Sequence, residues 1–332
     1  MYFDNKDGFL QPKVSQYDGH MVMTNVHKEI KAKHVNFDTK FRDDYQEYSK
    51  TTPTQYTMTM PTSITGVKSI ELISAEIPMS FFNISNSLGN NVMRITDTSS
   101  GTAYVIVLRD GTYTSSSLKT EINAQLTSLS VTGLVFDVSG NATTSTTIDN
   151  AYSSFVLTSA KTYTIDFAVK LDNMCSGILN APGTITATFD RYNVKSKLGW
   201  LLGFRNITYT ITGATGRLYS ENVIDLSNPR YLYLVVDEFS SSNPNSFMSL
   251  LPASFVSKNI LAKFQLDYKT YPLGVNAFLP CSQYSGNLQS DIRTYNGPTD
   301  LQRLKVQLVN EYGANINLNG SDFSFCLKIQ YS

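Results

Sequence analysis

The sequence predicts an all-β protein, built as an antiparallel sandwich or barrel with one or two short helices in long connections. The first observation is composition, because 20 Tyr, 18 Phe and many Thr and Val residues favour strands over helices. The second is pattern, since roughly a dozen short segments of strand type are separated by turn residues. Helices do not alternate with these segments, which disfavours a parallel α/β fold.

The strand signals begin at Gln55. Tyr56–Met60 alternates polar and apolar side chains, and we expect Pro61 to end this strand. A second strand covers Val67–Ile77, and Tyr104–Leu108 is a buried run. Further strands are expected at Leu134–Val138, Phe155–Leu157, Tyr163–Val169, Ile207–Ile211, Tyr231–Phe239, Ile260–Tyr268, Leu304–Val309 and Phe323–Tyr331.

One clear helix is expected after residue 114, where apolar residues recur at helical spacing behind a run of serines that offers N-cap candidates. Its face is Leu118, Ile122, Leu126 and Leu129, and its cap candidates are Ser115–Ser117. A second, short helix is expected over Val194–Leu202. Here Gly199 and Gly203 lie among apolar side chains, which indicates close packing, and Trp200, the only tryptophan, is expected to anchor the core.

The chain divides by composition. Residues 1–36 contain few apolar residues and are expected to form an extended N-terminal arm, while residues 37–332 form the β-sandwich domain. The arm either crosses a neighbouring subunit or is a flexible terminus, and both alternatives stay open. Residues about 97–190 are either long excursions of the sandwich or an inserted lobe.

Charge excludes several partners. The chain carries 27 Lys and Arg against 27 Asp and Glu, and charged residues make up 16% of it, below the roughly one quarter usual for soluble domains. We therefore expect no nucleic-acid partner, and an uncharged polar surface that suits close packing against neighbours. No apolar run approaches the roughly 18 residues that span a bilayer, and the start lacks an apolar signal region. Neither a membrane span nor secretory export is expected.

The sequence predicts no catalytic, cofactor-binding or metal-binding residues. All three histidines, His20, His27 and His34, precede the strand-like segments, so the body has no Ser-His-Asp or Cys-His arrangement of its own. The cysteines lack metal-ligand spacing and are expected to be free thiols. They are Cys175, Cys281 and Cys326.

Two adjacent acid pairs, Asp43-Asp44 and Asp237-Glu238, are the candidates for carboxylate chemistry. Neighbours on a strand point to opposite faces, so Asp237 and Glu238 are not expected to share a site, and solvation at the strand end is the favoured interpretation. The segment Gly213–Arg217 lacks the context of a phosphate loop and is expected to be a turn.

Several phrases, in order along the chain, resemble structural proteins of the nucleocytoplasmic large DNA viruses. They are His34–Asp43, Val67–Pro78, Phe82-Asn83-Ile84 with Asn90-Asn91, Asp110-Gly111-Thr112-Tyr113-Thr114 with Leu118–Leu126, and Leu198–Arg205. The resemblance is to jelly-roll minor capsid or penton (vertex) proteins. It implies a jelly-roll sandwich and a non-enzymatic capsid component, and it supplies no catalytic residues.

The resemblance implies a pentameric vertex subunit of the virion, assembled in the host cytoplasm. Its partners would be other copies of itself, the major capsid protein and other minor capsid proteins. Wedge-shaped copies can close a ring through heterologous contacts. An internal minor protein that cements the capsid lattice is the alternative within this class. A carbohydrate-binding β-sandwich module, recognisable by exposed aromatic platforms, is the competing class, and an enzyme ranks third.

Overall fold

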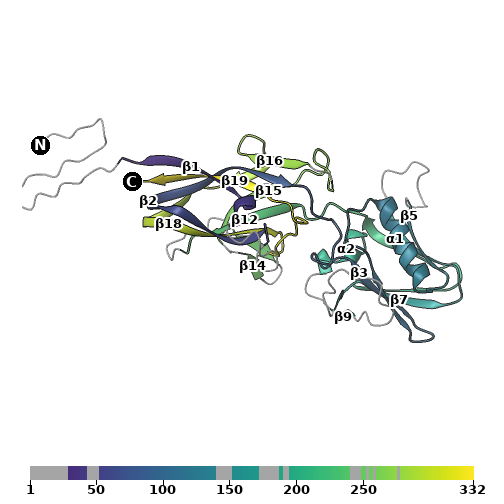
Figure 1. Cartoon of the computed structure of the whole chain (residues 1–332). Helices are drawn as coiled ribbons and strands as arrows, with labels where there is room; N and C mark the ends of the chain where they lie inside the picture. The colour runs from purple at the N-terminus through teal and green to yellow at the C-terminus, as the bar shows by residue number, and fades with distance from the viewer. Residues whose placement is uncertain are drawn as a thin grey trace, which may run out of the picture.

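The computed structural model describes residues 29–42, 52–139, 152–171, 187–189, 194–239, 248–251, 254–256, 259–274 and 277–332. In these residues the chain forms nineteen strands and two α-helices, and every strand pair is antiparallel. The predicted all-β antiparallel class is therefore confirmed. The strands gather in two lobes, a main lobe that holds β1 and β19 and a second lobe that holds α1 (Figure 1).

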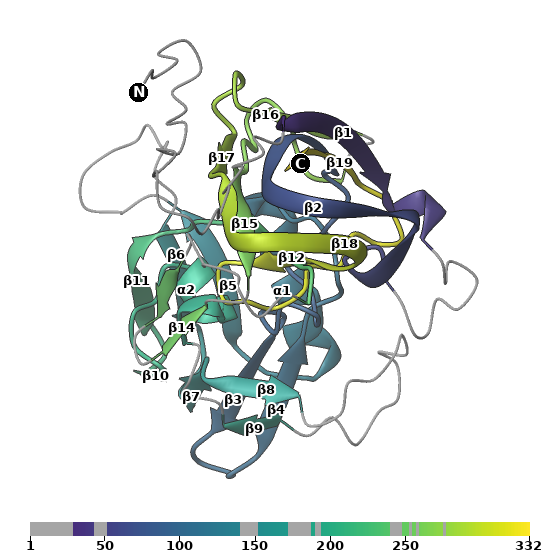
Figure 2. The same ribbon diagram turned by 90° about the vertical axis from the view of Figure 1, so that its left-hand side faces the viewer.

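Eight strands of the main lobe form one sheet in the order β1-β19-β2-β18-β12-β15-β17, with β16 also paired to β2. Their bounds are β1 Lys31–Asp38, β2 Gln55–Pro78, β12 Tyr231–Asp237, β15 Ile260–Gln265, β16 Phe278–Ser282, β17 Leu288–Ser290, β18 Arg293–Asn310 and β19 Ser324–Tyr331. The sheet curls, so that β1, β19 and the end of β2 lie across from β18, β12 and β15 (Figure 2). One apolar core lies between these halves, and alternate residues such as Leu327 and Leu234 fill it.

β2 is a single strand of 24 residues, so the prediction that Pro61 ends it is wrong. Pro61 falls where the ladder to β18 is interrupted, between the pairs Thr59–Arg303 and Ile64–Leu301. A proline has no N–H to donate, and it is therefore tolerated where no ladder hydrogen bond is required. Register shifts of this kind also bend a strand, which lets β2 serve both halves of the curled sheet.

β1 begins earlier than the sequence indicates. It starts at Lys31, inside the segment predicted as an arm, and it contains His34. Its partner is β19, at the opposite end of the chain, and Phe37 stacks on Phe325 with ring centroids 5.0 Å apart. Pairing between the two ends leaves no local signal, because most β1 side chains are exposed. The boundary predicted at residue 36 therefore falls within a strand.

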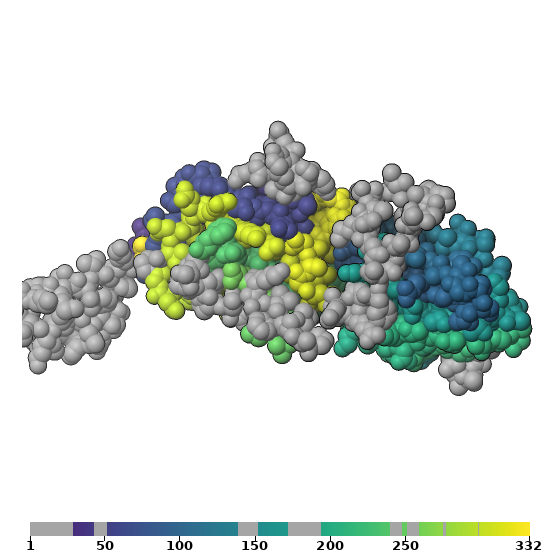
Figure 3. Space-filling model, turned by 90° about the horizontal axis from the view of Figure 1, so that it is seen from below, coloured from purple at the N-terminus to yellow at the C-terminus, as the bar shows by residue number. Residues whose placement is uncertain are grey.

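The second lobe has its own core. A four-stranded sheet, β10-β7-β3-β4, and a three-stranded sheet, β11-β6-β5, share with α1 a cluster of buried residues that includes Phe136, Phe155 and Phe204. The strands are β3 Val92–Asp97, β4 Ala103–Val107, β5 Leu134–Ser139, β6 Tyr152–Leu157, β7 Thr162–Asp166, β10 Thr208–Thr212 and β11 Arg217–Val223, with the separate pair β8 Val169–Leu171 and β9 Ala187–Phe189. Seen from below, the main lobe and the second lobe lie at opposite ends of the described part of the molecule (Figure 3). The predicted division into domains stays a prediction.

The helix α1 covers Ser115–Ser128 and buries Leu118, Ile122 and Leu126, which confirms the predicted face except at Leu129. Its N-cap is Thr114 rather than one of the serines after it. The Thr114 hydroxyl accepts from the Ser117 N–H, and the Ser117 hydroxyl accepts from the Thr114 N–H, a reciprocal capping box. Leu129 follows the last helical residue and is exposed. In the part of the chain that the structure describes, no helix has the length and apolarity to cross a membrane.

The predicted short helix forms in two pieces, a 3-10 turn at Val194–Ser196 and α2 at Leu198–Leu201. A Cβ on Gly199 would lie 2.3 Å from a ring atom of Phe167, and one on Gly203 would lie 2.0 Å from a backbone carbonyl oxygen. Close packing at both glycines is therefore confirmed.

Trp200 is not a core anchor. It is half-buried, while the leucines of α2 on either side of it fill the core of the second lobe. The guanidinium carbon of Arg205 lies 4.2 Å from its ring centroid, and the Lys195 ammonium lies 5.7 Å away. The ring therefore sits at the surface against cations and does not offer a free platform to a sugar.

Candidate functional site

Two crossings join the lobes, residues 79–91 leading out of the main lobe and residues 224–230 leading back. We call these crossings, together with the loop at residues 110–114, the neck. Asn83 lies in it and is 4% exposed. Its amide donates to the carbonyls of Tyr113 at 2.9 Å and Leu226 at 3.3 Å, and its Oδ1 accepts from the Tyr113 N–H at 2.9 Å. One side chain thus ties both crossings to the loop.

Two more polar side chains complete the neck. Asn90 is fully buried; it donates to the Asn83 carbonyl at 2.8 Å and accepts from the Ser85 N–H at 2.8 Å. Asp110 accepts from the Asn86 N–H at 2.8 Å. Buried backbone groups outside helices and sheets still need partners, and Asn90 supplies them, while Asp110 forms its bond at the exposed edge of the neck. The neck is therefore a hydrogen-bonded joint rather than a loose linker.

Loops of the main lobe hydrogen-bond to both crossings. The Ser80 hydroxyl donates to the Leu318 carbonyl at 2.6 Å, and the Asn319 amide donates to the Ser80 carbonyl at 2.6 Å. On the returning crossing, the Tyr268 hydroxyl donates to the Pro229 carbonyl. These bonds hold each crossing to a loop of the main lobe.

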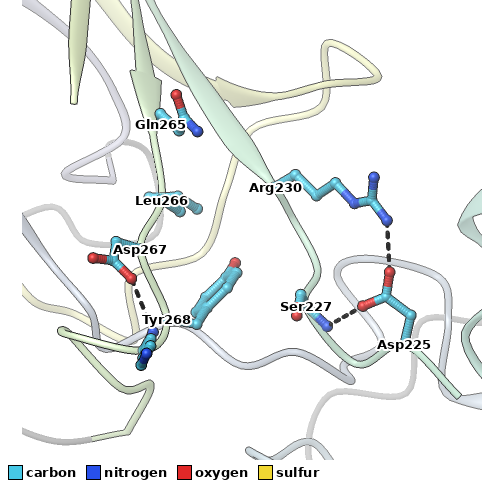
Figure 4. A pocket seen from close by; sticks show the side chains of 8 residues that line it. Asp225, Ser227, Arg230, Gln265, Leu266, Asp267 and Tyr268 are labelled. Carbon is cyan, nitrogen blue, oxygen red and sulfur yellow. Dashed lines mark hydrogen bonds and ion pairs between the residues drawn. The ribbon is translucent and has the colours of Figure 1, made fainter. Parts of the chain in front are cut away.

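A hollow of about 430 Å³ lies beside the returning crossing (Figure 4). Asp225 pairs with Arg230 at 2.6 Å and accepts from the Ser227 N–H at 3.0 Å, while Asp267 accepts from the N–H groups of its own turn. The carboxylates that line the hollow are therefore engaged by neighbouring residues. Its lining residues are Asp225, Ser227, Arg230, Gln265, Leu266, Asp267, Tyr268 and Lys269.

Asp237 and Glu238 do not form a shared acidic site, but the interpretation that both are solvated is wrong for Glu238. The side chains of Glu238 and Arg293 are fully buried and pair at 2.9 Å. The Tyr295 hydroxyl donates to the second carboxylate oxygen at 2.5 Å. Because Arg293 comes from a distant strand, no local pattern around Glu238 could indicate this burial.

Arg293 also holds both stems of the excursion between β12 and β15, at residues 238–259. Its Nη1 donates to the Val236 carbonyl at 2.8 Å and its Nη2 to the Asn259 carbonyl at 2.7 Å. The excursion carries β13 (Ser249–Leu251) and β14 (Ser254–Val256). Three large apolar side chains of the excursion are exposed, Phe239 at 56%, Met248 at 62% and Leu250 at 78%. The excursion is therefore hydrogen-bonded to Arg293 at both of its ends and exposes apolar side chains between them.

The remaining candidates are dispersed. Cys281 is buried and Cys326 is partly exposed, and neither forms a disulfide. The Gly216 N–H donates to the Gly213 carbonyl at 2.9 Å, which confirms the predicted turn. Within the described ranges, no three His, Cys, Asp or Glu side chains are placed to hold a metal ion. Outside the described residues lie His20, His27, Asp43, Asp44 and Cys175.

The main lobe has two outer faces of opposite charge. On β1, β19 and β2, the residues that alternate with the buried ones point away from the core, in cross-strand rows such as Asp38–Ser324–Glu76 and Lys328–Glu71. The Ser324 hydroxyl also donates to Glu76 at 3.2 Å. Three acids and two bases, Lys68 and Lys328, line this surface, which we call the acidic face.

The opposite surface, over β18, β12 and β15, combines bases with tyrosines, and part of it is covered. Tyr233, Val235, Ile260 and Val309 on this side are buried in a small cluster of their own, against which Tyr231 packs. The rings of Tyr231 and Tyr233 meet with centroids 5.3 Å apart, and the Lys263 ammonium lies 4.4 Å from the Tyr231 centroid. Ser249 of β13 lies near Tyr231, so the excursion adjoins this surface. We call it the basic face. Its outward charged residues are Lys263, Arg303, Lys305, Asp237 and Asp300.

Comparison of the sequence with models of protein families gives no match, and comparison with curated proteins gives none. Among solved structures, the chain is similar to the crystal structure of the mavirus penton protein, with a TM-score of 0.41 and 8% sequence identity. The superposition covers 92% of this chain and 100% of that chain. A likeness of this size decides neither fold nor function, which rest on the features described above.

Proposed function

We propose that this chain is a structural protein of the capsid of a large icosahedral DNA virus, and that five copies of it form the vertex. The observation that carries the proposal is the neck. Two segments that resemble capsid proteins of such viruses meet there: Asn83 hydrogen-bonds to the backbone of Tyr113, and Ile84 exchanges backbone hydrogen bonds with Gly111. The segments are Phe82-Asn83-Ile84 with Asn90-Asn91, and Asp110-Gly111-Thr112-Tyr113-Thr114. Phrases that are separate in sequence but joined in space belong to one structural device, which makes chance resemblance a poor explanation.

A rigid joint suits a vertex subunit. Heterologous contacts close a ring only when each copy presents its two sides at the same fixed angle. The buried hydrogen bonds of the neck hold the second lobe at one orientation to the main lobe. The low content of charged residues lets sides meet without burying unpaired ions. In the virion, the partners would be copies of this chain, the major capsid protein and other minor capsid proteins.

Light scattering of the purified chain tests the proposal. A vertex subunit gives a stable species with five times the mass of the 36.9 kDa chain over a range of concentrations. A strict monomer at high concentration contradicts the vertex role and favours an internal protein that cements the lattice. Cryo-electron microscopy of the intact particle then decides the position, because vertex density lies on the five-fold axes.

A further inference from the structure

We infer that the acidic face of one copy packs against the basic face of the next copy around the ring. The inference rests on the proposed function, since it names the surfaces by which that ring would assemble. The occupant of each face is therefore a second copy of this chain. The faces are the outer surfaces of the two halves of the curled sheet, and the main core lies between these halves. A head-to-tail contact requires two such separate surfaces.

Charge is the first argument. The acidic face carries Asp38, Glu71 and Glu76 against Lys68 and Lys328, a formal balance of 2 − 3 = −1. The basic face carries Lys263, Arg303 and Lys305 against Asp237 and Asp300, a balance of 3 − 2 = +1. Two acidic faces repel each other, as do two basic faces, so symmetric face-to-face dimers are disfavoured. Only unlike faces attract, and that pairing is the heterologous one that makes rings.

Exposed apolar side chains on both faces are the second argument. Phe239, Met248 and Leu250 are exposed on the excursion that adjoins the basic face. On the acidic face, Phe278 is 54% exposed, because it alternates along β16 with the buried residues Leu279 and Cys281. Protein interfaces are enriched in aromatic residues and Met, while complementary charge sets orientation. Apolar contact therefore supplies affinity here, and the charges select the head-to-tail arrangement.

Charge reversal tests the assignment. One variant, Glu71→Lys with Glu76→Lys, reverses the acidic face, and a second, Arg303→Glu with Lys305→Glu, reverses the basic face. Each alone places like charges in contact and should weaken self-association at least about tenfold. A third chain carrying all four substitutions restores unlike faces and should form rings of the wild-type size. The control is Lys170→Glu, at an exposed position on β8 in the second lobe, which should leave association unchanged.

Mixing the two double variants adds a sharper readout. Each face of one variant attracts only the other variant, so copies must alternate and an odd-numbered ring cannot close. Mass photometry should show association without the wild-type ring mass. Recovery by the fourfold variant also rules out misfolding as the cause of the losses.

The possible results distinguish failure of the proposed contact between faces from failure of the proposed vertex function. Wild-type rings that persist in every single-face reversal overturn the assigned faces and leave the vertex proposal standing. A wild-type chain that stays monomeric overturns the ring and the contact together. Loss in both double variants with recovery in the fourfold chain supports the contact.

Discussion

The buried ion pair of the main lobe supports a quantitative prediction for Arg293→Leu. The substitution leaves the fully buried Glu238 carboxylate with only the Tyr295 hydroxyl as a donor. Burial and the adjacent carboxylate raise the pKa of Tyr295, so that hydroxyl keeps its proton but cannot neutralise the charge. Breaking a buried pair from one side costs about 3–5 kcal/mol. Two backbone carbonyls also lose a donor at about 1 kcal/mol each, so we expect a loss of about 5–7 kcal/mol.

Urea unfolding followed by far-ultraviolet circular dichroism measures this loss, and a matched variant isolates its cause. Arg293→Leu combined with Glu238→Leu removes both charges and should be more stable than Arg293→Leu alone, because no buried charge is left unpaired. The exposed Lys170→Leu, on β8 in the second lobe, should change the free energy of unfolding by no more than about 0.5 kcal/mol. A loss below about 1 kcal/mol for Arg293→Leu, or a double variant less stable than it, would refute the reasoning.

Three further changes probe the packing and charge of both lobes. Burial raises the pKa of the Cys281 thiol to about 12, so iodoacetamide at pH 8 should spare it in the native chain and modify it after unfolding, as peptide mapping would reveal. Gly199→Ala should cost about 1–3 kcal/mol by overpacking, whereas Gly297→Ala, with open space around it, should cost far less in the same thermal melts. The hydrogen bond from Lys161 lowers the pKa of Asp97 below 3.8, so this carboxylate stabilises the fold above that pH and the gain is lost as pH falls through the lowered pKa. Asp97→Asn should reduce the acid slope in that window, and an unchanged slope would contradict it.

The all-β class follows from local pattern, while its pairings do not. In β19 the residues Phe325, Leu327 and Ile329 alternate with polar neighbours, and all three are buried, so period two was enough to predict this strand. β1 lacks such alternation because most of its side chains face solvent at a sheet edge. Similarly, β11 is mostly exposed and was not predicted. Strands whose stability comes from distant partners rather than from their own apolar face leave little trace in the sequence.

The polar interior was the least predictable part. Glu238 sits at a strand end, where an acid is usually solvated, and only its contact with Arg293 reverses that expectation. Asn83 forms a glycosylation sequon with the two residues after it, yet its amide donates hydrogen bonds to backbone carbonyls of the neck. In both cases the deciding partner lies tens of residues away. Spacing rules that work within one helix or strand cannot reach it.

The neck constrains the identity of its residues more strictly than the strands around it do. A core position in a sheet accepts Val, Ile, Leu or Phe at similar cost, so the sequence of a strand can drift while its fold persists. Position 83 must donate to two carbonyls and accept from one N–H at the same time. An Asn side chain does this, while the carboxylate of Asp cannot donate and the side chain of Leu can do neither. Irregular buried backbone therefore dictates residue identity more strictly than apolar packing does.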